Sequence, residues 1–176
     1  MEHLPLIDRL ESDGLAFAGL LSGVSKQQAR WKPEPGRWCL TQVAAHLYDE
    51  EWEDFKPRLV GVLSEDNFVP AFLDDPERRS AERKYSEWSL GETLSKFEDE
   101  RRRSVEYLRS LQSPDWQRSF VIPDVMELSA GEILSAWVAH DLVHIRQITA
   151  LLFHFLEERS KPYNVEYAGI FDVPMR

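Results

Sequence analysis

The chain has a single cysteine, Cys39, among its 176 residues, and it has fewer basic residues than acidic ones. One thiol excludes an intrachain disulfide framework and any zinc site built from several cysteines, and it suits a reducing compartment. The 21 lysines and arginines face 31 aspartates and glutamates, which gives a formal net charge of −10. The densest basic run, 101–103, follows three acidic residues at helical spacing that partly neutralise it. We therefore expect no nucleic-acid-binding surface.

Long hydrophobic runs are also missing, because no stretch approaches the roughly 18 uncharged apolar residues that a membrane span requires. The first residues show no positively charged leader followed by an apolar core. We therefore expect a cytoplasmic protein without a membrane partner. Alternating strand patterns are absent too, so no substantial sheet is expected. A hydrophobic content of 43% is enough for one core, and we expect a single domain over residues 1–176.

Four helices account for the periodic hydrophobic residues. The sequences Ser89-x-x-Glu92 and Ser129-x-x-Glu132 are typical of capping boxes, which begin helices. Thr41 is the expected N-cap of an earlier helix, and a proline at position 57 should kink or loosen that helix. The expected ranges are about 4–22, 41–63, 89–111 and 129–158, with a packed tail over 159–176. The sequence thus predicts an all-α protein.

The connections between these helices predict the bundle topology. About 24 residues, 64–87, join the second and third helices, which is more than an antiparallel hairpin needs. We expect this connection to be a long crossover that passes one end of the bundle. The next connection, 112–128, contains proline and aromatic residues and is expected to be a packed loop. The sequence therefore indicates a four-helix bundle with a long crossover between helices 2 and 3.

Two histidines, His140 and His144, lie four residues apart on the apolar face of the last predicted helix. Helical geometry separates them by roughly 40° in azimuth and about 6 Å along the axis, so both can point at one metal ion. Zinc and nickel sites generally need a third protein ligand. His46 can supply it if the second and fourth helices are neighbours. In the alternative interpretation, the three are separate core histidines that pair with carboxylates such as Glu50.

Two other metal motifs do not fit. The pattern His140-Asp141-x-x-His144 has aspartate where the metalloprotease motif requires a glutamate base. A di-iron bundle needs two Glu-x-x-His pairs, and this chain has none. The remaining possibility is an open three-histidine site, with coordination positions left for water or substrate.

Several polar and aromatic residues are candidates for the pocket or for contacts to the ligands, although none can be assigned as catalytic. Arg101 interrupts the apolar face of the third helix, where it either pairs with a carboxylate across the bundle or binds an anion beside the metal. Cys39 is expected to be a small, partly buried residue rather than a ligand. The complete candidate set is Glu50, Arg101, Trp137, Asp141 and Gln147.

The sequence around the three histidines resembles the DinB-like family of metal-binding four-helix bundles. The matching segments are 31–38, 42–50, Tyr85 with the helix over 90–111, and 140–148, so the resemblance covers most of the chain. The family commonly has serine or another small polar residue where this chain has Cys39. The resemblance implies that His46, His140 and His144 bind a divalent metal, with Zn²⁺ or Ni²⁺ as the first candidates.

The family includes transferases and isomerases related to bacillithiol and mycothiol chemistry. The resemblance therefore implies a metal-dependent S-transferase that activates a low-molecular-weight thiol against a small-molecule substrate. It also implies a homodimer. A metal-dependent hydrolase that uses a bound water is the alternative enzyme, and a non-catalytic metal-binding or stress-responsive protein is the alternative outside catalysis.

Overall fold

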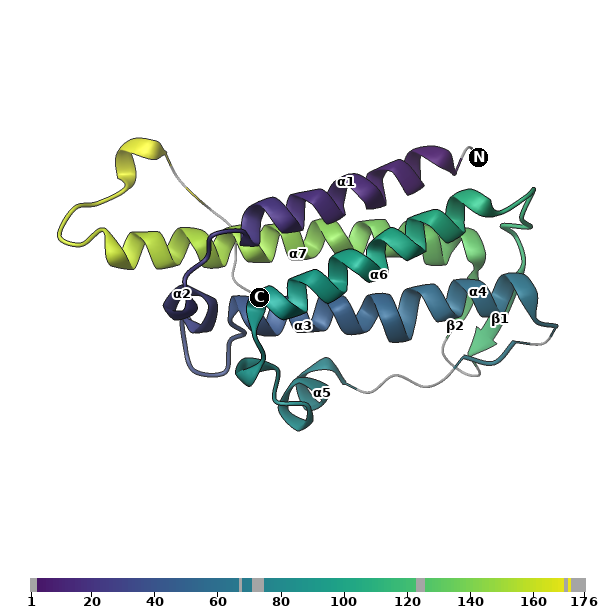
Figure 1. Ribbon diagram of the computed structural model, residues 1–176, viewed down its shortest axis with the longest axis horizontal. Coiled ribbons are helices and arrows are strands. Elements are labelled where there is room, and N and C mark those ends of the chain that lie inside the picture. The colour runs from purple at the N-terminus through teal and green to yellow at the C-terminus, as the bar shows by residue number, and fades with distance from the viewer. Residues whose placement is uncertain (1–2, 67, 71–74, 123–125, 170, 172–176) are drawn as a thin grey trace.

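Four long helical segments run side by side along one axis in the computed structural model (Figure 1). The structure describes residues 3–66, 68–70, 75–122, 126–169 and 171. The first segment is α1 (Leu4–Leu21). The second comprises α3 (Leu40–Asp49), η1 (Glu50–Phe55) and α4 (Lys56–Ser64). The others are α6 (Leu90–Ser110) and α7 (Ala130–Arg159). Each predicted helix is confirmed to within about one residue at either end.

Polar caps set these ends. Ser129 Oγ accepts the backbone N–H of Glu132 at 3.3 Å, and the Glu132 carboxylate accepts the N–H of Ser129 at 2.8 Å, which completes the expected capping box of α7. The prediction for Thr41 is wrong. Cys39 is the N-cap of α3, and its N–H donates to Gln42 Oε1 at 3.2 Å. Thr41 lies in the first turn, where its hydroxyl donates to the carbonyl of Ala29.

The second segment loosens before Pro57 rather than at it. Proline has no N–H, and its ring collides with the carbonyl four residues earlier in a regular α-helix. Here the six residues of η1 wind as a π-helix. This wider turn accommodates the missing N–H and the ring of Pro57, and the segment continues into α4. This irregular turn carries Glu50 and Glu51, which are both buried.

The bundle pairs parallel helices. α1 and α7 run in one direction, and the segment from α3 to α4 runs with α6 in the other (Figure 1). The crossover contains α5 (Pro76–Glu82) and the 3-10 turn η2 (Tyr85–Glu87), which pack against α3. Because α6 begins at the same end of the bundle as α3, this connection returns along the length of the bundle. The crossover is confirmed, but the expectation that it passes one end is wrong.

Shorter elements complete the fold. Ser25 caps α2 (Lys26–Arg30), and η3 (Glu166–Ala168) lies in the tail. The connection predicted as a packed loop contains an antiparallel pair of strands, β1 (Ser119–Ile122) and β2 (Met126–Ser129). Within the described residues, no helix is long and apolar enough to cross a membrane.

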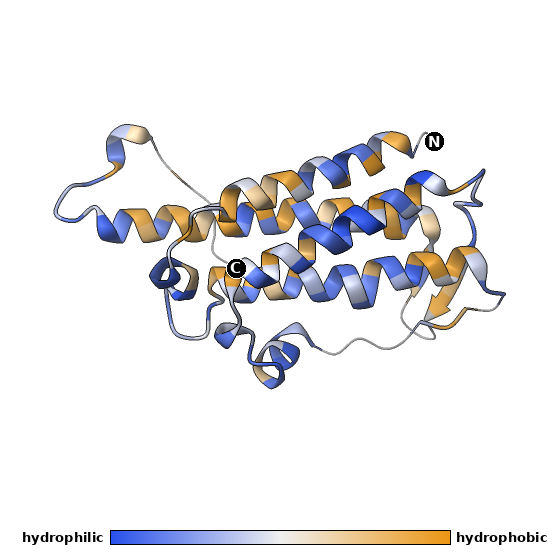
Figure 2. Ribbon diagram, viewed as in Figure 1, coloured by the Kyte–Doolittle hydropathy of each residue, from blue (hydrophilic) through white to orange (hydrophobic). Residues whose placement is uncertain are grey.

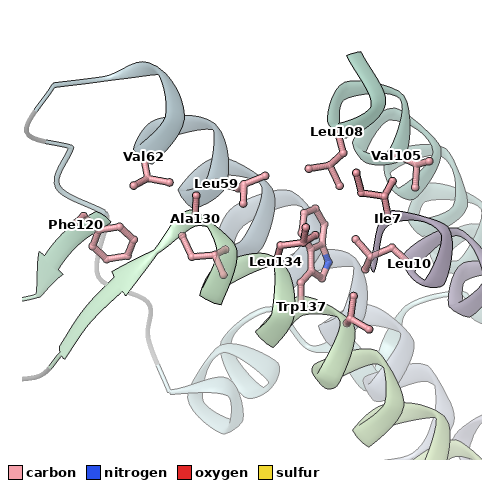
Figure 3. Close-up of a cluster of buried hydrophobic side chains, with 12 residues drawn as sticks. Ile7, Leu10, Leu59, Val62, Val105, Leu108, Phe120, Ala130, Leu134 and Trp137 are labelled. Atoms are coloured by element: carbon pink, nitrogen blue, oxygen red, sulfur yellow. The ribbon is translucent and has the colours of Figure 1, made fainter. Parts of the chain in front are cut away.

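Each long helix carries both apolar and hydrophilic residues along its length (Figure 2). The apolar residues pack inward and form two clusters of the core. One cluster surrounds Leu10, Leu59 and Trp137 near the hairpin (Figure 3). The other surrounds Phe17 and Phe97 toward the opposite end. In each of the four segments, a buried charged residue lies between the residues of one cluster and those of the other. We call this set the polar layer; it consists of Asp13, Glu51, Arg101 and Asp141.

Candidate metal centre

The three predicted ligands meet in space. His46 comes from α3, and His140 and His144 come from successive turns of α7. The Nε2 atom of His140 lies 3.3 Å from Nε2 of His46 and 3.1 Å from Nε2 of His144. One potential ligand atom from each histidine lies within 4.8 Å of the others. The second and fourth helices are therefore neighbours, as the sequence argument requires.

The donor set fits a divalent metal ion. Zinc–nitrogen bonds of about 2.0–2.1 Å place two nitrogens of a tetrahedral site roughly 3.3 Å apart, and both short separations are close to this value. Among the described residues, the cluster contains histidines alone, without a carboxylate or thiolate ligand. Three imidazoles leave coordination positions for another molecule. The geometry and the fold together suggest a divalent metal.

The environment keeps these imidazoles neutral. Burial and the neighbouring imidazoles lower the pKa of His46 to about 2. Burial also lowers the pKa of His140 to about 3, with contributions from His144 and Arg101, and it lowers the pKa of His144. Since neutral imidazole is the form that binds a metal, the histidines are ready to act as ligands at neutral pH.

Two predicted residues contact the outer nitrogens of these histidines. Gln147 Oε1 lies 2.8 Å from Nδ1 of His144; an N–H there donates to the amide oxygen and leaves the Nε2 lone pair toward the cluster. Glu50 Oε1 lies 3.5 Å from Nδ1 of His46. Burial, together with Asp54 beside it, raises the pKa of Glu50 to about 7. Both side chains thus contact an imidazole of the cluster on the side away from the Nε2 atoms.

Arg79 is a contact that the sequence argument missed. Its guanidinium donates to Glu50 Oε1 at 3.1 Å, and the side chain is buried. It lies on α5, in a connection whose sequence has no long periodic pattern. Only the three-dimensional path of the crossover brings it beside the carboxylate that faces His46.

Of the other three candidates, Arg101 and Asp141 belong to the polar layer, and Trp137 contacts it. Arg101 donates to both carboxylate oxygens of Glu51, at 3.0 and 3.1 Å, and to both oxygens of Asp141. It also donates to the carbonyl of Leu10. The Trp137 indole N–H donates to Glu51 at 2.9 Å. Arg101 thus pairs with carboxylates across the bundle, as one of the two interpretations proposed. Arg101, Trp137 and Asp141 thus connect α6 and α7 with Glu51 of η1.

A pocket of about 280 Å³ opens beside His46 and His144. Trp38 forms one wall, with its ring 5.1 Å from that of His46, and its indole N–H donates to Glu77 at 2.8 Å. Arg37, which the sequence argument also missed, is another wall residue. The full lining is Gly36, Arg37, Trp38, His46, Pro76, Glu77, His144 and Gln147. A small molecule in this pocket would lie next to two of the three histidines.

Comparisons with known proteins agree with this architecture. The model of the DinB superfamily matches residues 9–148, and the chain belongs to that superfamily. One similar solved structure is YfiT from Bacillus subtilis, at 22% sequence identity and a TM-score of 0.74, covering 86% of each chain. That protein is described as a probable metal-dependent hydrolase with an unusual four-helix bundle topology. No curated protein matches this sequence significantly.

Proposed function

We propose that this protein is a metal-dependent enzyme that activates a small thiol for transfer to an electrophilic substrate. The observation that carries the proposal is the convergence of the Nε2 atoms of His46, His140 and His144 at the edge of a pocket. Zn²⁺ or Ni²⁺ held by these three residues would lower the pKa of a thiol bound beside it.

The residues around the histidines support such a reaction by positioning. Gln147 and Glu50 hold the rings of His144 and His46 from behind. Trp38 covers one side of the pocket with an apolar surface that limits access of water. The pocket volume suits a small thiol or a part of a larger one.

Thiol activation is favoured because it requires no separate base once the thiol is acidified. Within the described lining, Glu77 is the one carboxylate, and it accepts a hydrogen bond from the Trp38 indole. Activation of water usually benefits from a nearby general base. A hydrolase is the second candidate, with Glu77 as its base, and the description of YfiT as a probable metal-dependent hydrolase supports it.

Metal content provides the first test. We expect about one equivalent of metal in the wild-type protein and little in a His144→Ala variant. His154→Ala is the matched control, because His154 lies on the same helix and contacts Glu157 instead of the cluster. Equal metal content in wild type and His144→Ala would contradict the proposal.

Activity provides the second test. The metal-loaded protein is assayed for conjugation of several small thiols to 1-chloro-2,4-dinitrobenzene and for hydrolysis of nitrophenyl esters. Conjugation that is lost with a chelator and restored by Zn²⁺ or Ni²⁺ supports the transferase. Metal-dependent ester hydrolysis without conjugation would contradict the transferase and support the hydrolase.

A further inference from the structure

A rigid turn presents Arg37 to the pocket beside the site histidines. The backbone N–H of Arg37 donates to the carbonyl of Glu34 at 3.2 Å. Pro35 and Gly36 occupy the two central positions of this turn, and Gly36 has a φ of +87°. This combination is typical of a type II turn, whose third residue needs a positive φ. The turn and the anchored Trp38 that follows hold the backbone of Arg37 in place.

Arg37 differs from the other arginines that are at least partly buried in the described part of the chain. Each of the others forms an ion pair, and these pairs are Arg58 with Asp54, Arg79 with Glu50, Arg101 with Glu51 and Asp141, and Arg118 with Asp66. Arg37 forms no ion pair with a described carboxylate, although acidic residues outnumber basic ones in this protein. A partly desolvated guanidinium gains from an anionic partner. Among the described residues, Arg37 has no such partner.

Glu77 is the acidic residue that lines the pocket together with Arg37. Its carboxylate accepts the Trp38 indole N–H and forms no ion pair with Arg37. Glu77 therefore leaves the guanidinium available while adding a negative charge to the lining. A carboxylate monoanion suffers less repulsion from that charge than a phosphate dianion does.

We propose that Arg37 binds a carboxylate of the substrate, so that this pocket selects carboxylate-bearing thiols over neutral ones. The inference rests on the proposed thiol chemistry and specifies its substrate class. A guanidinium can hold a carboxylate through two parallel hydrogen bonds, which fixes orientation as well as charge. Arg37 and the histidine cluster would thus engage two ends of one small molecule.

The first measurement compares matched thiols on the Zn²⁺-loaded protein by titration calorimetry. The pairs are mercaptoacetate with 2-mercaptoethanol, and 3-mercaptopropionate with 3-mercapto-1-propanol. We expect the wild type to bind at least one carboxylate thiol about 10-fold more tightly than its neutral partner. Arg37→Gln should abolish this preference, and Arg37→Lys should retain part of it. Arg30→Gln is the charge-matched control, because Arg30 is exposed at the end of α2 and lies outside the pocket lining.

The second measurement separates this inference from the metal chemistry. Propanoate and inorganic phosphate are titrated into the metal-free protein while NMR follows the Trp38 indole N–H. Propanoate binding that weakens in Arg37→Gln supports carboxylate recognition even if no thiol binds the loaded protein; in that case the thiol chemistry alone fails. Equal propanoate binding by wild type and Arg37→Gln would refute the role of Arg37. Tighter binding of phosphate would overturn the assignment to a carboxylate.

Discussion

Replacement of Arg101 by methionine tests the polar layer most directly. The Arg101 side chain is 5% exposed, and the side chains of its partners Glu51 and Asp141 are each 1% exposed. Methionine retains much of the length and apolar surface, so the main change is loss of the cation. Glu51 keeps its hydrogen bond from Trp137, but Asp141 loses the hydrogen bonds it accepts from Arg101. Breaking a buried ion pair from one side typically costs about 3–5 kcal/mol, and we expect a loss in this range.

Urea denaturation of the metal-free protein measures this loss without a contribution from metal binding. Arg102→Met is the matched control, because Arg102 is the next residue on α6 and its side chain is 58% exposed. Its surface pairs with Asp99 and Glu106 should be worth no more than about 1 kcal/mol. A loss for Arg101→Met within about 1 kcal/mol of the Arg102→Met loss would refute the reasoning.

The cause can be isolated by combining Arg101→Met with Asp141→Asn. If an unpaired buried carboxylate causes the destabilisation, the second substitution should restore at least about 1 kcal/mol in the Arg101→Met background. In the wild-type background the same Asp141→Asn change removes a partner of Arg101 and should destabilise. Additive losses in the double variant would show that charge pairing is not the source.

Three further predictions concern packing, metal affinity and pH. Gly61→Ala should destabilise by about 1–3 kcal/mol, because an added Cβ would overlap the Phe68 ring, whereas Gly19→Ala has free space and should stabilise by about 1 kcal/mol; equal thermal shifts would contradict this. Gln147→Leu should weaken zinc binding about 10-fold in a competition titration, and unchanged affinity would argue against its orienting role. Two site histidines have pKa values lowered to about 2 and about 3, so the unfolded chain takes up protons below pH 6.5 that the folded chain does not. In the metal-free protein each of them should therefore cost up to roughly 1.4 kcal/mol per pH unit as pH falls from 6 to 4, while Glu50 and Asp141, whose pKa values are raised to about 7 and about 6, favour the folded state over the same range. The histidine contribution is the difference in pH dependence between the wild type and a His46→Gln/His140→Gln variant, and equal pH dependence of the two proteins would contradict the pKa shifts.

The helices were predictable because their signals are local. Ser129 and Glu132 define the start of α7 within four consecutive residues, and apolar periodicity defines its buried face. The pairing of His140 with His144 follows from one helical turn in the same way. His46 required one further assumption, that the second and fourth helices are neighbours. The similarity of the short motifs to the family made that assumption reasonable.

The missed features depend on contacts between segments that are distant in sequence. Arg79 reaches Glu50 because the crossover returns along the bundle, and nothing in its local sequence indicates that path. Thr41 has the side chain of a good N-cap, but the buried Cys39 occupies that position and Gln42 provides the capping contact. A capping preference of about 1 kcal/mol is small enough for packing at a helix junction to override it.

The position of the polar layer explains why a cation is placed in the middle of the core. Asp141 follows His140 directly in α7, and Glu51 lies about one turn after His46 in the second segment, so Arg101 joins the two segments that carry the three histidines. A well-packed apolar layer could stabilise a bundle equally well. Apolar contacts, however, tolerate small rotations and shifts of a helix, whereas paired hydrogen bonds to a planar guanidinium depend on direction. Because imidazole nitrogens must converge within a few tenths of an ångström to share a metal ion, such directional contacts next to His140 in sequence would stabilise the arrangement that the proposed metal binding requires.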